Sequence, residues 1–239
     1  MSGTVIIHGV IFDLDGVLIL TADAHFKSWE QLVAENGLAV TREQFLSTFG
    51  RPNRDIIPRL WGGPLDAATI DALGERKEEL YRRIVRGALP VAGGANELIR
   101  ACHAAGLKLA IGSSTHPQNL ALTMAQTGWG PYFAATVTGR DVSRGKPDPE
   151  VFQLAAARLG LSPQECVVIE DAPAGIQAAR AAGCAAVGVM THHGAEALWA
   201  AGAGLVVGTL EELTVLTLRQ LRPGQEWRTA TGGGSPAWG

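Results

Sequence analysis

Short apolar runs alternate with helical patterns along most of the chain. Runs at residues 5–12 (interrupted at His8 and Gly9), 107–111, 166–169, 185–189 and 205–207 predict strands. None of these runs alternates strictly between apolar and polar residues. Such runs are typical of strands that are covered on both faces, as in a parallel sheet.

The segments between these runs show helical patterns with visible ends. Helices are predicted at residues 97–105, 149–159 and 174–182, and a glycine suited to the left-handed C′ position follows each of them. Residues 162–165 form a predicted capping box with Pro163 at the first helical position. This repetition of strand and helix predicts an α/β fold, with a doubly wound parallel sheet and a Rossmann-like core.

Residues 21–89 have a different pattern. Helical periodicity at residues 22–36, 42–49, 54–60 and 66–86 accounts for nearly all of this segment, and Thr41 opens a second capping box. We interpret the segment as a small all-helical cap domain inserted after the first strand and closed by Pro90. The core then comprises residues 1–20 and 90–222, and the Gly-rich residues 223–239 are predicted to form a flexible tail.

Composition and charge narrow the range of partners and compartments. Hydrophobic residues make up 46% of the 239, enough for a sizeable core, and the formal net charge of −3 offers no basic excess for nucleic acid. The chain has three cysteines, all widely spaced, and shows neither a signal-peptide pattern nor an apolar run of membrane-spanning length. We expect a cytoplasmic monomer or weak homodimer with no nucleic-acid or membrane partner.

Two acidic residues follow directly on the first predicted strand. Asp13 and Asp15 stand in the segment FDLDGVL, and Gly16 allows the chain to turn after them. In an open α/β sheet, ligands bind at the carboxyl ends of the strands, so both side chains would project into the crevice. Two close carboxylates repel each other unless a cation or a proton lies between them. Taken alone, the segment fits a simple strand end and turn equally well.

Three further segments favour a phosphate site. Ser113 and Ser114 end another strand with hydroxyls that can donate to phosphoryl oxygens. Lys146 stands beside a helix start and offers a point charge suited to phosphate. Glu170 and Asp171 form a second acidic pair at a strand end, and oxygen ligands from two strand ends suit Mg²⁺.

With these motifs in order between residues 5 and 221, the chain resembles the haloacid dehalogenase-like hydrolase superfamily, in its phosphatase and β-phosphoglucomutase-like branch. The resemblance implies that Asp13 is a nucleophile that forms an aspartyl-phosphate and that Asp15 is the general acid and base. It implies that Ser113 and Lys146 hold the phosphoryl group. The implied ligands of Mg²⁺ are Asp13, the backbone carbonyl of Asp15, Asp171 and, directly or through water, Glu170.

The chemistry supports these roles independently. A phosphomonoester dianion repels an anionic nucleophile, so the site needs a divalent cation and a lysine to offset that charge. An aspartate nucleophile divides the hydrolysis into two easier steps, and Asp15 can act as acid in one and as base in the other. Dehalogenases of the superfamily lack this second acid, which argues against carbon–halogen cleavage.

The inserted helices resemble the family's cap, which closes over the site and selects the substrate. His25 resembles a histidine at this place in the β-phosphoglucomutase-like enzymes, where it contributes to cap closure and substrate handling. An equal alternative is a surface or half-buried histidine beside Trp29, a core residue one helical turn away. Arg54, in a Gly- and Pro-containing loop, is suited to reach an anionic substrate or is simply a solvated arginine.

Two other groups of residues offer weaker candidates. His192 and His193 lack acidic neighbours in the sequence and are interpreted as part of a solvated loop. Lys27 and Lys77 could form the Schiff base of a phosphonate-cleaving enzyme, but we interpret both as exposed helical lysines. No Walker loop, dinucleotide-binding fingerprint or serine-hydrolase elbow occurs.

The sequence therefore predicts a Mg²⁺-dependent phosphatase that acts on a small phosphorylated metabolite, such as a sugar phosphate. A β-phosphoglucomutase-like phosphosugar mutase is the nearest alternative. A non-catalytic binding protein that retains the fold is the third.

Overall fold

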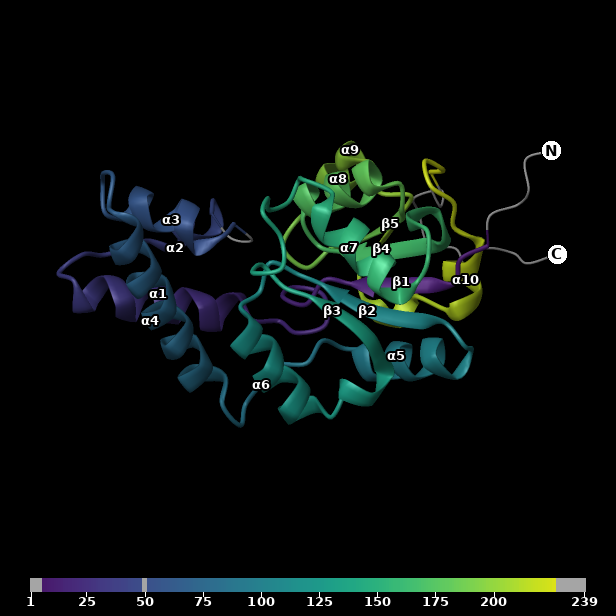
Figure 1. Cartoon of the computed structure of the whole chain (residues 1–239), viewed down its shortest axis with the longest axis horizontal. Helices are drawn as coiled ribbons and strands as arrows, with labels where there is room; N and C mark the ends of the chain where they lie inside the picture. Colours follow the sequence, from purple (N-terminus) through teal and green to yellow (C-terminus); the bar gives the residue numbers. More distant parts are fainter. Residues whose placement is uncertain (1–5, 49–50, 227–239) are drawn as a thin grey trace.

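The computed structural model of the chain describes residues 6–48 and 51–226, which form two lobes (Figure 1). The larger lobe is built on a six-stranded parallel sheet with the order β3-β2-β1-β4-β5-β6. The strands are β1 (Gly9–Phe12), β2 (Lys108–Gly112), β3 (Phe133–Val137), β4 (Cys166–Glu170), β5 (Ala185–Val189) and β6 (Leu205–Val207). The strand order reverses between β1 and β4, which is where an open α/β sheet binds its ligands.

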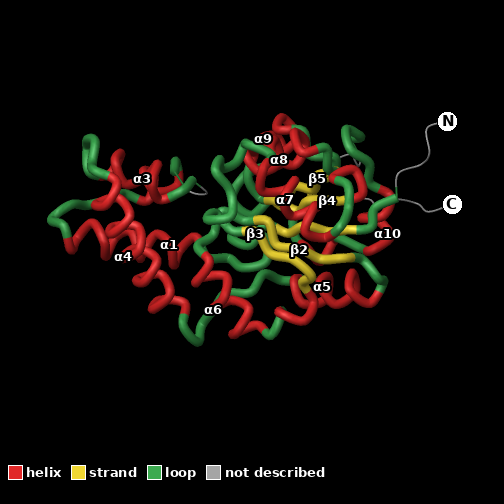
Figure 2. The backbone as a smooth tube through the Cα atoms, viewed as in Figure 1, coloured by secondary structure: helices red, strands yellow, loops and turns green. Residues whose placement is uncertain are grey.

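Helices cover both faces of the sheet (Figure 2). One face carries α5 (Ala95–Ala104), α6 (Pro117–Thr127) and α10 (Val215–Gln220), and the other carries α7 (Glu150–Leu159), α8 (Pro173–Ala182) and α9 (Ala195–Ala201). Successive β1 residues point to opposite faces, so Val10 and Phe12 pack into one core and Ile11 into the other. This double burial explains why the strands are continuously apolar. The predicted doubly wound fold is confirmed.

The smaller lobe consists of the inserted helices α1 (Ala22–Glu35), α2 (Arg42–Leu46), α3 (Asn53–Leu60) and α4 (Ala67–Val85). It has a hydrophobic core of its own, in which Trp29 and Leu32 of α1 meet Ile57 of α3 and Leu80 of α4. The predicted capping box at Thr41 is present, with both of its hydrogen bonds. The predicted second helix ends at Leu46, and residue 49 lies outside the described part of the chain.

The two segments that join the lobes run side by side. The backbone N–H of Leu20 donates to the carbonyl of Pro90 (2.7 Å), and that of Ala92 donates to the carbonyl of Leu18 (3.0 Å). Between these bonds, Ile19 pairs with Val91 in an antiparallel bridge. The insertion therefore leaves the sheet and returns to it through one two-stranded connection.

Several elements differ from the sequence-based expectation. The first strand begins only at Gly9, and the capping box at residues 162–165 opens a single 3₁₀ turn. The edge strand β3 was not predicted, because its sequence FAATV is mostly small residues and only half-buried. Helices α6, α9 and α10 were not predicted either. The predicted tail lies outside the described residues from position 227 onward. No helix in the described part of the chain combines the length and apolarity needed to cross a membrane.

Candidate active site

The site lies at the carboxyl end of β1, where the sheet order reverses. The chain continues from Phe12 into Asp13, whose N–H donates to the carbonyl of Ile169 on β4 (2.9 Å). Gly16 then turns the chain with a φ of +85°, which favours glycine, and its N–H donates to the carbonyl of Ile19 (2.7 Å). The tight turn keeps Asp13 and Asp15 at the sheet edge.

Three acidic side chains meet beside this turn. Asp13, Glu170 and Asp171 are all buried and can each offer one oxygen, with all of these oxygens within 4.8 Å of one another. Lys146 Nζ donates to Asp13 Oδ1 (2.8 Å) and to Glu170 Oε1 (2.6 Å). The other Glu170 oxygen accepts from the N–H groups of Asp171 and Ala172, each at 2.8 Å. Residues from three predicted motifs are thus joined in one cluster.

Burial of these like charges perturbs their protonation. Desolvation raises the pKa of Glu170 from its ordinary value of 4.5 to about 7, against the attraction of Lys146 and with added repulsion from Asp13 and Asp171. Desolvation likewise raises the pKa of Asp13, despite Lys146. Although burial opposes it, Asp13 and Glu170 raise the pKa of Lys146. Three carboxyl groups lie together in a buried place, and Lys146 bonds only two of them, Asp13 and Glu170. Hard oxygen donors of this kind fit a divalent cation.

Asp15 is bonded to the beginning of the inserted segment. Its Oδ1 accepts hydrogen bonds from Thr21 Oγ1 (2.5 Å) and from His25 Nε2 (3.3 Å). Burial by itself raises the pKa of Asp15, but these bonds, with that from His25 the larger contribution, hold the pKa below its ordinary range. The contacts in this arrangement therefore favour the ionised form of Asp15.

His25 is held in turn by a buried lysine. Lys77 Nζ lies 2.7 Å from His25 Nδ1 and 2.9 Å from Glu78 Oε1, and its side chain is 3% exposed. An ammonium group can only donate, so His25 Nδ1 accepts and its Nε2–H points to Asp15. The His25 ring also stacks on Tyr81. The interpretation of Lys77 as an exposed lysine was wrong, because it lies on the apolar stripe of α4, three and four residues before Leu80 and Tyr81. Lys27 is exposed as expected.

Glu78 connects the lobes. Its carboxylate also accepts from Asn53 (2.7 Å) at the start of α3 and from Asn119 (2.6 Å) on α6 of the core. Burial acts to raise the pKa of Glu78, but Lys77 and the other donors lower it to about 2. Glu78 was not among the residues predicted for the site.

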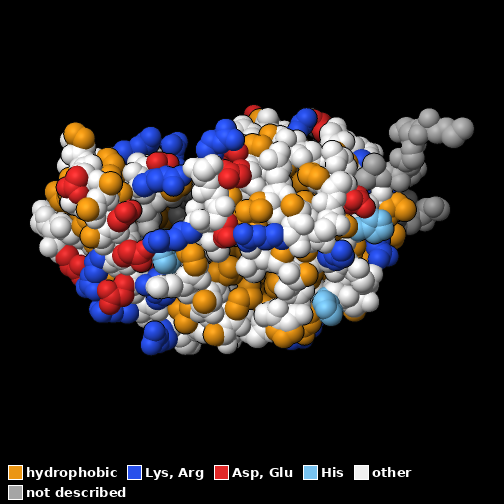
Figure 3. Space-filling view, in the orientation of Figure 1, with side chains coloured by type: hydrophobic (Ala, Val, Ile, Leu, Met, Phe, Trp, Pro, Cys, Tyr) orange, Lys and Arg blue, Asp and Glu red, His pale blue; other side chains and the backbone are white. Residues whose placement is uncertain are grey.

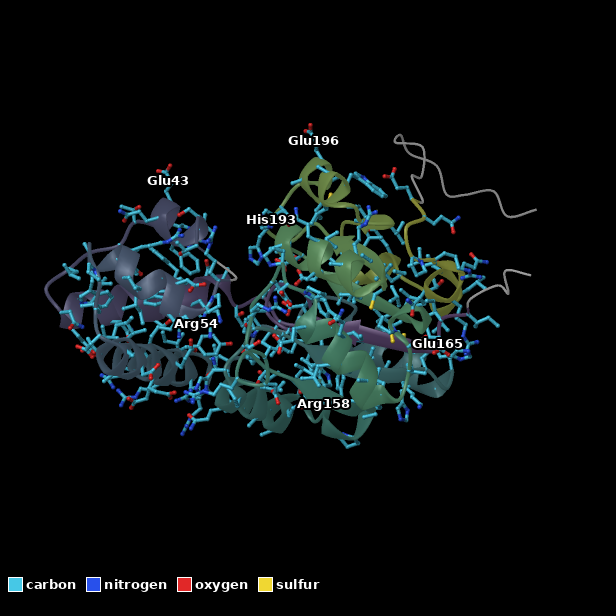
Figure 4. All side chains as sticks on the ribbon, turned by 45° about the horizontal axis from the view of Figure 1, so that its top comes forward. Glu43, Arg54, Arg158, Glu165, His193 and Glu196 are labelled. Atoms are coloured by element: carbon cyan, nitrogen blue, oxygen red, sulfur yellow. The ribbon has the colours of Figure 1, made fainter. Side chains whose placement is uncertain are left out.

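The outer part of the junction is strongly charged. Glu75 on α4 forms a hydrogen bond with His116 (3.1 Å) and an ion pair with Arg140 of the core. Lys and Arg side chains gather on both lobes along the seam between them (Figure 3). Arg54, Glu75 and Arg140 line a cavity of about 630 Å³ there, and Arg54 lies on the side of the inserted lobe that faces the core (Figure 4).

The predicted hydroxyl residues follow the strand next to β1. Because Phe12 pairs with Ile111, Ser113 and Ser114 emerge at the same sheet edge as the acidic cluster. Ser113 is buried, and its N–H donates to the carbonyl of Val137 (3.0 Å) while its Oγ accepts from Thr115 N–H (3.3 Å). Ser114 is half-buried.

The two histidines after β5 are not simply solvated. His192 Nδ1 lies 2.6 Å from Asp171 Oδ2, and His193 Nδ1 lies 3.0 Å from the backbone oxygen of Asp171. The expectation that they lack an acidic partner was wrong, because the partner is 21 residues away in sequence and adjacent in the sheet. Figure 4 shows His193 on the side of the core that faces the inserted lobe.

Fold and site together define an α/β enzyme with a helical insertion over an acidic centre. Residues 7–183 match the model of the haloacid dehalogenase-like hydrolase family, and the chain belongs to that family. It is 32% identical over 210 residues to the phosphorylated carbohydrates phosphatase of Thermotoga maritima, covering 87% of this chain and 97% of that protein. It is also 32% identical over 218 residues to the beta-phosphoglucomutase of Bacillus subtilis, covering 88% and 93%.

A solved structure of β-phosphoglucomutase from Clostridium difficile superposes with a TM-score of 0.80 at 26% identity, covering 88% of this chain and 95% of that one. These findings confirm the predicted branch of the superfamily and the fold. They also confirm that the chain is an enzyme of the phosphomonoester hydrolase type.

We expect the stability of the protein in a metal chelator to fall as the pH rises. The folded state keeps the Glu170 proton up to about pH 7, whereas the unfolded chain releases it near 4.5, so the folded state binds more protons between these values. The stabilising effect is therefore complete below about pH 4.5 and is lost as the pH rises through 7. Melting temperatures measured from pH 5 to 8 should decline, and Glu170→Gln should flatten the decline. Equal slopes in both proteins would contradict this assignment.

Gly175 is expected to be essential to the position of Glu170. A Cβ at residue 175 would lie 1.8 Å from Glu170 Oε1, and Glu170 is fixed on both of its oxygens. Gly175→Ala should therefore destabilise the protein by about 1–3 kcal/mol, as overpacking does, and should lower activity. Gly63→Ala is the matched control, because no atom lies within 4 Å of its added Cβ. Denaturant unfolding and phosphate release measure the two effects, and identical behaviour of the two variants would refute the packing argument.

Proposed function

We propose that this protein is a Mg²⁺-dependent phosphatase of a small phosphorylated sugar or a similar metabolite, and that it works through an aspartyl-phosphate on Asp13. The observation that carries the proposal is the buried cluster of Asp13, Glu170 and Asp171 at the sheet's reversal point, with Lys146 bonded to the first two. The phosphatase relatives support the reaction type, and the relative from Thermotoga maritima supports a carbohydrate phosphate as substrate.

The metal would be held by the carboxylates of Asp13 and Asp171, by the backbone carbonyl of Asp15, and by Glu170 directly or through water. Mg²⁺, when bound, offsets the negative charge that the phosphoryl group brings to these carboxylates. Lys146 adds a second positive charge beside Asp13. We assign Ser113 and Ser114, which emerge at the same edge, to the phosphoryl oxygens.

Asp13 forms a bond to phosphorus while the bond from phosphorus to the sugar oxygen breaks, and Asp15 gives its proton to that oxygen. Water then attacks the phosphorus of the aspartyl-phosphate, Asp15 takes a proton from it, and phosphate leaves Asp13. For the first step Asp15 must carry a proton, although Thr21 and His25 favour its ionised form. Both donors belong to the inserted segment, so movement of that segment away from the core removes them and lets Asp15 take up a proton.

Residues 21–89 act in this proposal as the cap that closes over the site and excludes water. Arg54 also lines a polar cavity of about 630 Å³ at the outer part of the junction, together with Asp71, Glu75 and Arg140, whereas Asp13, Glu170 and Asp171 do not line it. Arg54 and His25 would contact the part of the substrate that is not transferred. A small phosphorylated metabolite is thus the proposed partner.

A phosphosugar mutase is the second candidate. The bond from His25 to Asp15 holds the acid and base under the inserted helices, where a second sugar hydroxyl could replace water. The similarity to the Bacillus subtilis beta-phosphoglucomutase favours this candidate as well. Phosphatases among the relatives, including the fructose-1-phosphate phosphatase YqaB of Escherichia coli at 33% identity over 186 residues, favour hydrolysis.

The expected result of a sugar phosphate panel is Mg²⁺-dependent release of phosphate by the purified protein. Asp13→Asn should lower kcat by at least about 10³-fold, because the nucleophile is lost. Asp66→Asn is the control, since Asp66 only caps α4 and asparagine caps equally well. Phosphate-conserving interconversion of glucose phosphates, followed by ³¹P NMR, would instead establish the mutase. Full activity of Asp13→Asn would disprove the nucleophile.

His25 should control the protonation of Asp15. His25→Ala removes the donor, so the pKa of Asp15 rises. Because Asp15 must carry a proton in the first step, which kcat/KM reports, the basic limb of the kcat/KM profile should move to higher pH. His25→Gln can place an amide N–H near the position of Nε2 and should restore much of the profile. An unchanged limb in His25→Ala would show that His25 does not act on Asp15.

A further inference from the structure

The loop after β5 brings two histidines to one acidic residue, and the mechanism above uses neither of them. His192 Nδ1 contacts the side chain of Asp171 at 2.6 Å, and His193 Nδ1 contacts the backbone oxygen of the same residue at 3.0 Å. A carboxylate and a carbonyl oxygen both accept, so each histidine donates from Nδ1. The two rings therefore hold Asp171 at its side chain and at its backbone.

The fold fixes this loop against the acidic cluster. β5 lies next to β4 with Gly188 paired to Glu170, so the chain leaves β5 beside Asp171. The N–H of Met190 donates to the carbonyl of Val207 on β6 (2.9 Å). The N–H of Thr191 donates to the carbonyl of Val189 (2.8 Å), which closes a tight turn of the kind common at strand ends. His192 follows this turn directly.

The acidic residues of the cluster are held by different groups. Lys146 bonds Asp13 and Glu170, and backbone N–H groups hold the second oxygen of Glu170. Asp171 is held instead by His192, through Oδ2. The same Oδ2 lies against Gly16, where an added Cβ would come within 2.3 Å of it. The added Cβ would also come within 2.9 Å of Oδ1, so the whole carboxylate of Asp171 packs on Gly16, and His192 bonds its Oδ2.

We propose that His192 is a positioning residue of the metal site: its Nδ1–H fixes Asp171 Oδ2, so that the other carboxylate oxygen is presented to the divalent cation. The proposal rests on the Mg²⁺ site of the proposed function. Partners in this position orient a metal-binding carboxylate and tune its affinity without touching the metal themselves. Because Mg²⁺ prefers oxygen ligands, we assign the bond to the metal to the Asp171 carboxylate and not to the His192 imidazole.

Titration calorimetry of MgCl₂ into the metal-free full-length protein tests the proposal. His192→Ala should raise the Kd for Mg²⁺ by about 10- to 100-fold. His192→Asn can place an amide N–H near the position of Nδ1 and should recover most of the affinity. His103→Ala is the matched control, because this exposed histidine lies in α5 away from the site, and its Kd should equal that of the wild type.

Melting temperatures with EDTA and with MgCl₂ separate positioning from a purely structural role. If His192 acts through the metal, the metal-free melting temperature of His192→Ala stays near that of the wild type and the rise on adding Mg²⁺ shrinks, because ligand stabilisation follows the Kd. A wild-type Kd in His192→Ala, or a loss of melting temperature in EDTA with no change in Kd, overturns the proposal for His192 alone. Failure of the wild type itself to bind Mg²⁺ overturns the proposed metal as well.

Discussion

The main constraint on the site is the repulsion among the carboxylates at the carboxyl ends of β1 and β4, which the rest of the structure must offset. Bringing Asp13, Glu170 and Asp171 together in a buried place costs free energy, which the raised pKa of Glu170 reflects. The doubly wound sheet provides rigid strand ends that keep these groups in place, and Lys146 offsets part of their charge. Because the three carboxylates carry more negative charge than Lys146 can offset, the cluster suits a divalent cation.

A second polar network extends this centre into the inserted helices. It runs from Asp15 through His25 and Lys77 to Glu78, and it ends on Asn119 of the core. Each link is a hydrogen bond between buried or partly buried groups, where an unpaired partner is costly. The protonation of Asp15 and the position of the cap are therefore coupled, because the same bonds determine both.

The sequence was informative where chemistry follows a strand directly, as at Asp13 or Glu170, because a buried apolar run and its next residue are local features. The sequence was misleading where a side chain's hydrogen-bond partner is distant in the sequence. Lys77 looked like one more charge on a helix, although its spacing to Leu80 and Tyr81 could have placed it on the buried face. His192 could not be assigned, since its contact with Asp171 requires knowledge that β5 lies next to β4. Edge strand β3 was missed because small, half-buried residues carry little pattern.

The paired connection at Ile19 and Val91 has a consequence for how such enzymes diversify. Because the two ends of the helical lobe meet in adjacent backbone segments, none of the six strands of the sheet uses a residue between 22 and 85. A different lobe, or a short turn, could be grafted at this junction and leave the strand register intact. Such an exchange would also replace His25, Lys77 and Glu78, so the sheet would be kept while the hydrogen bonds that govern the protonation of Asp15 changed with the lobe.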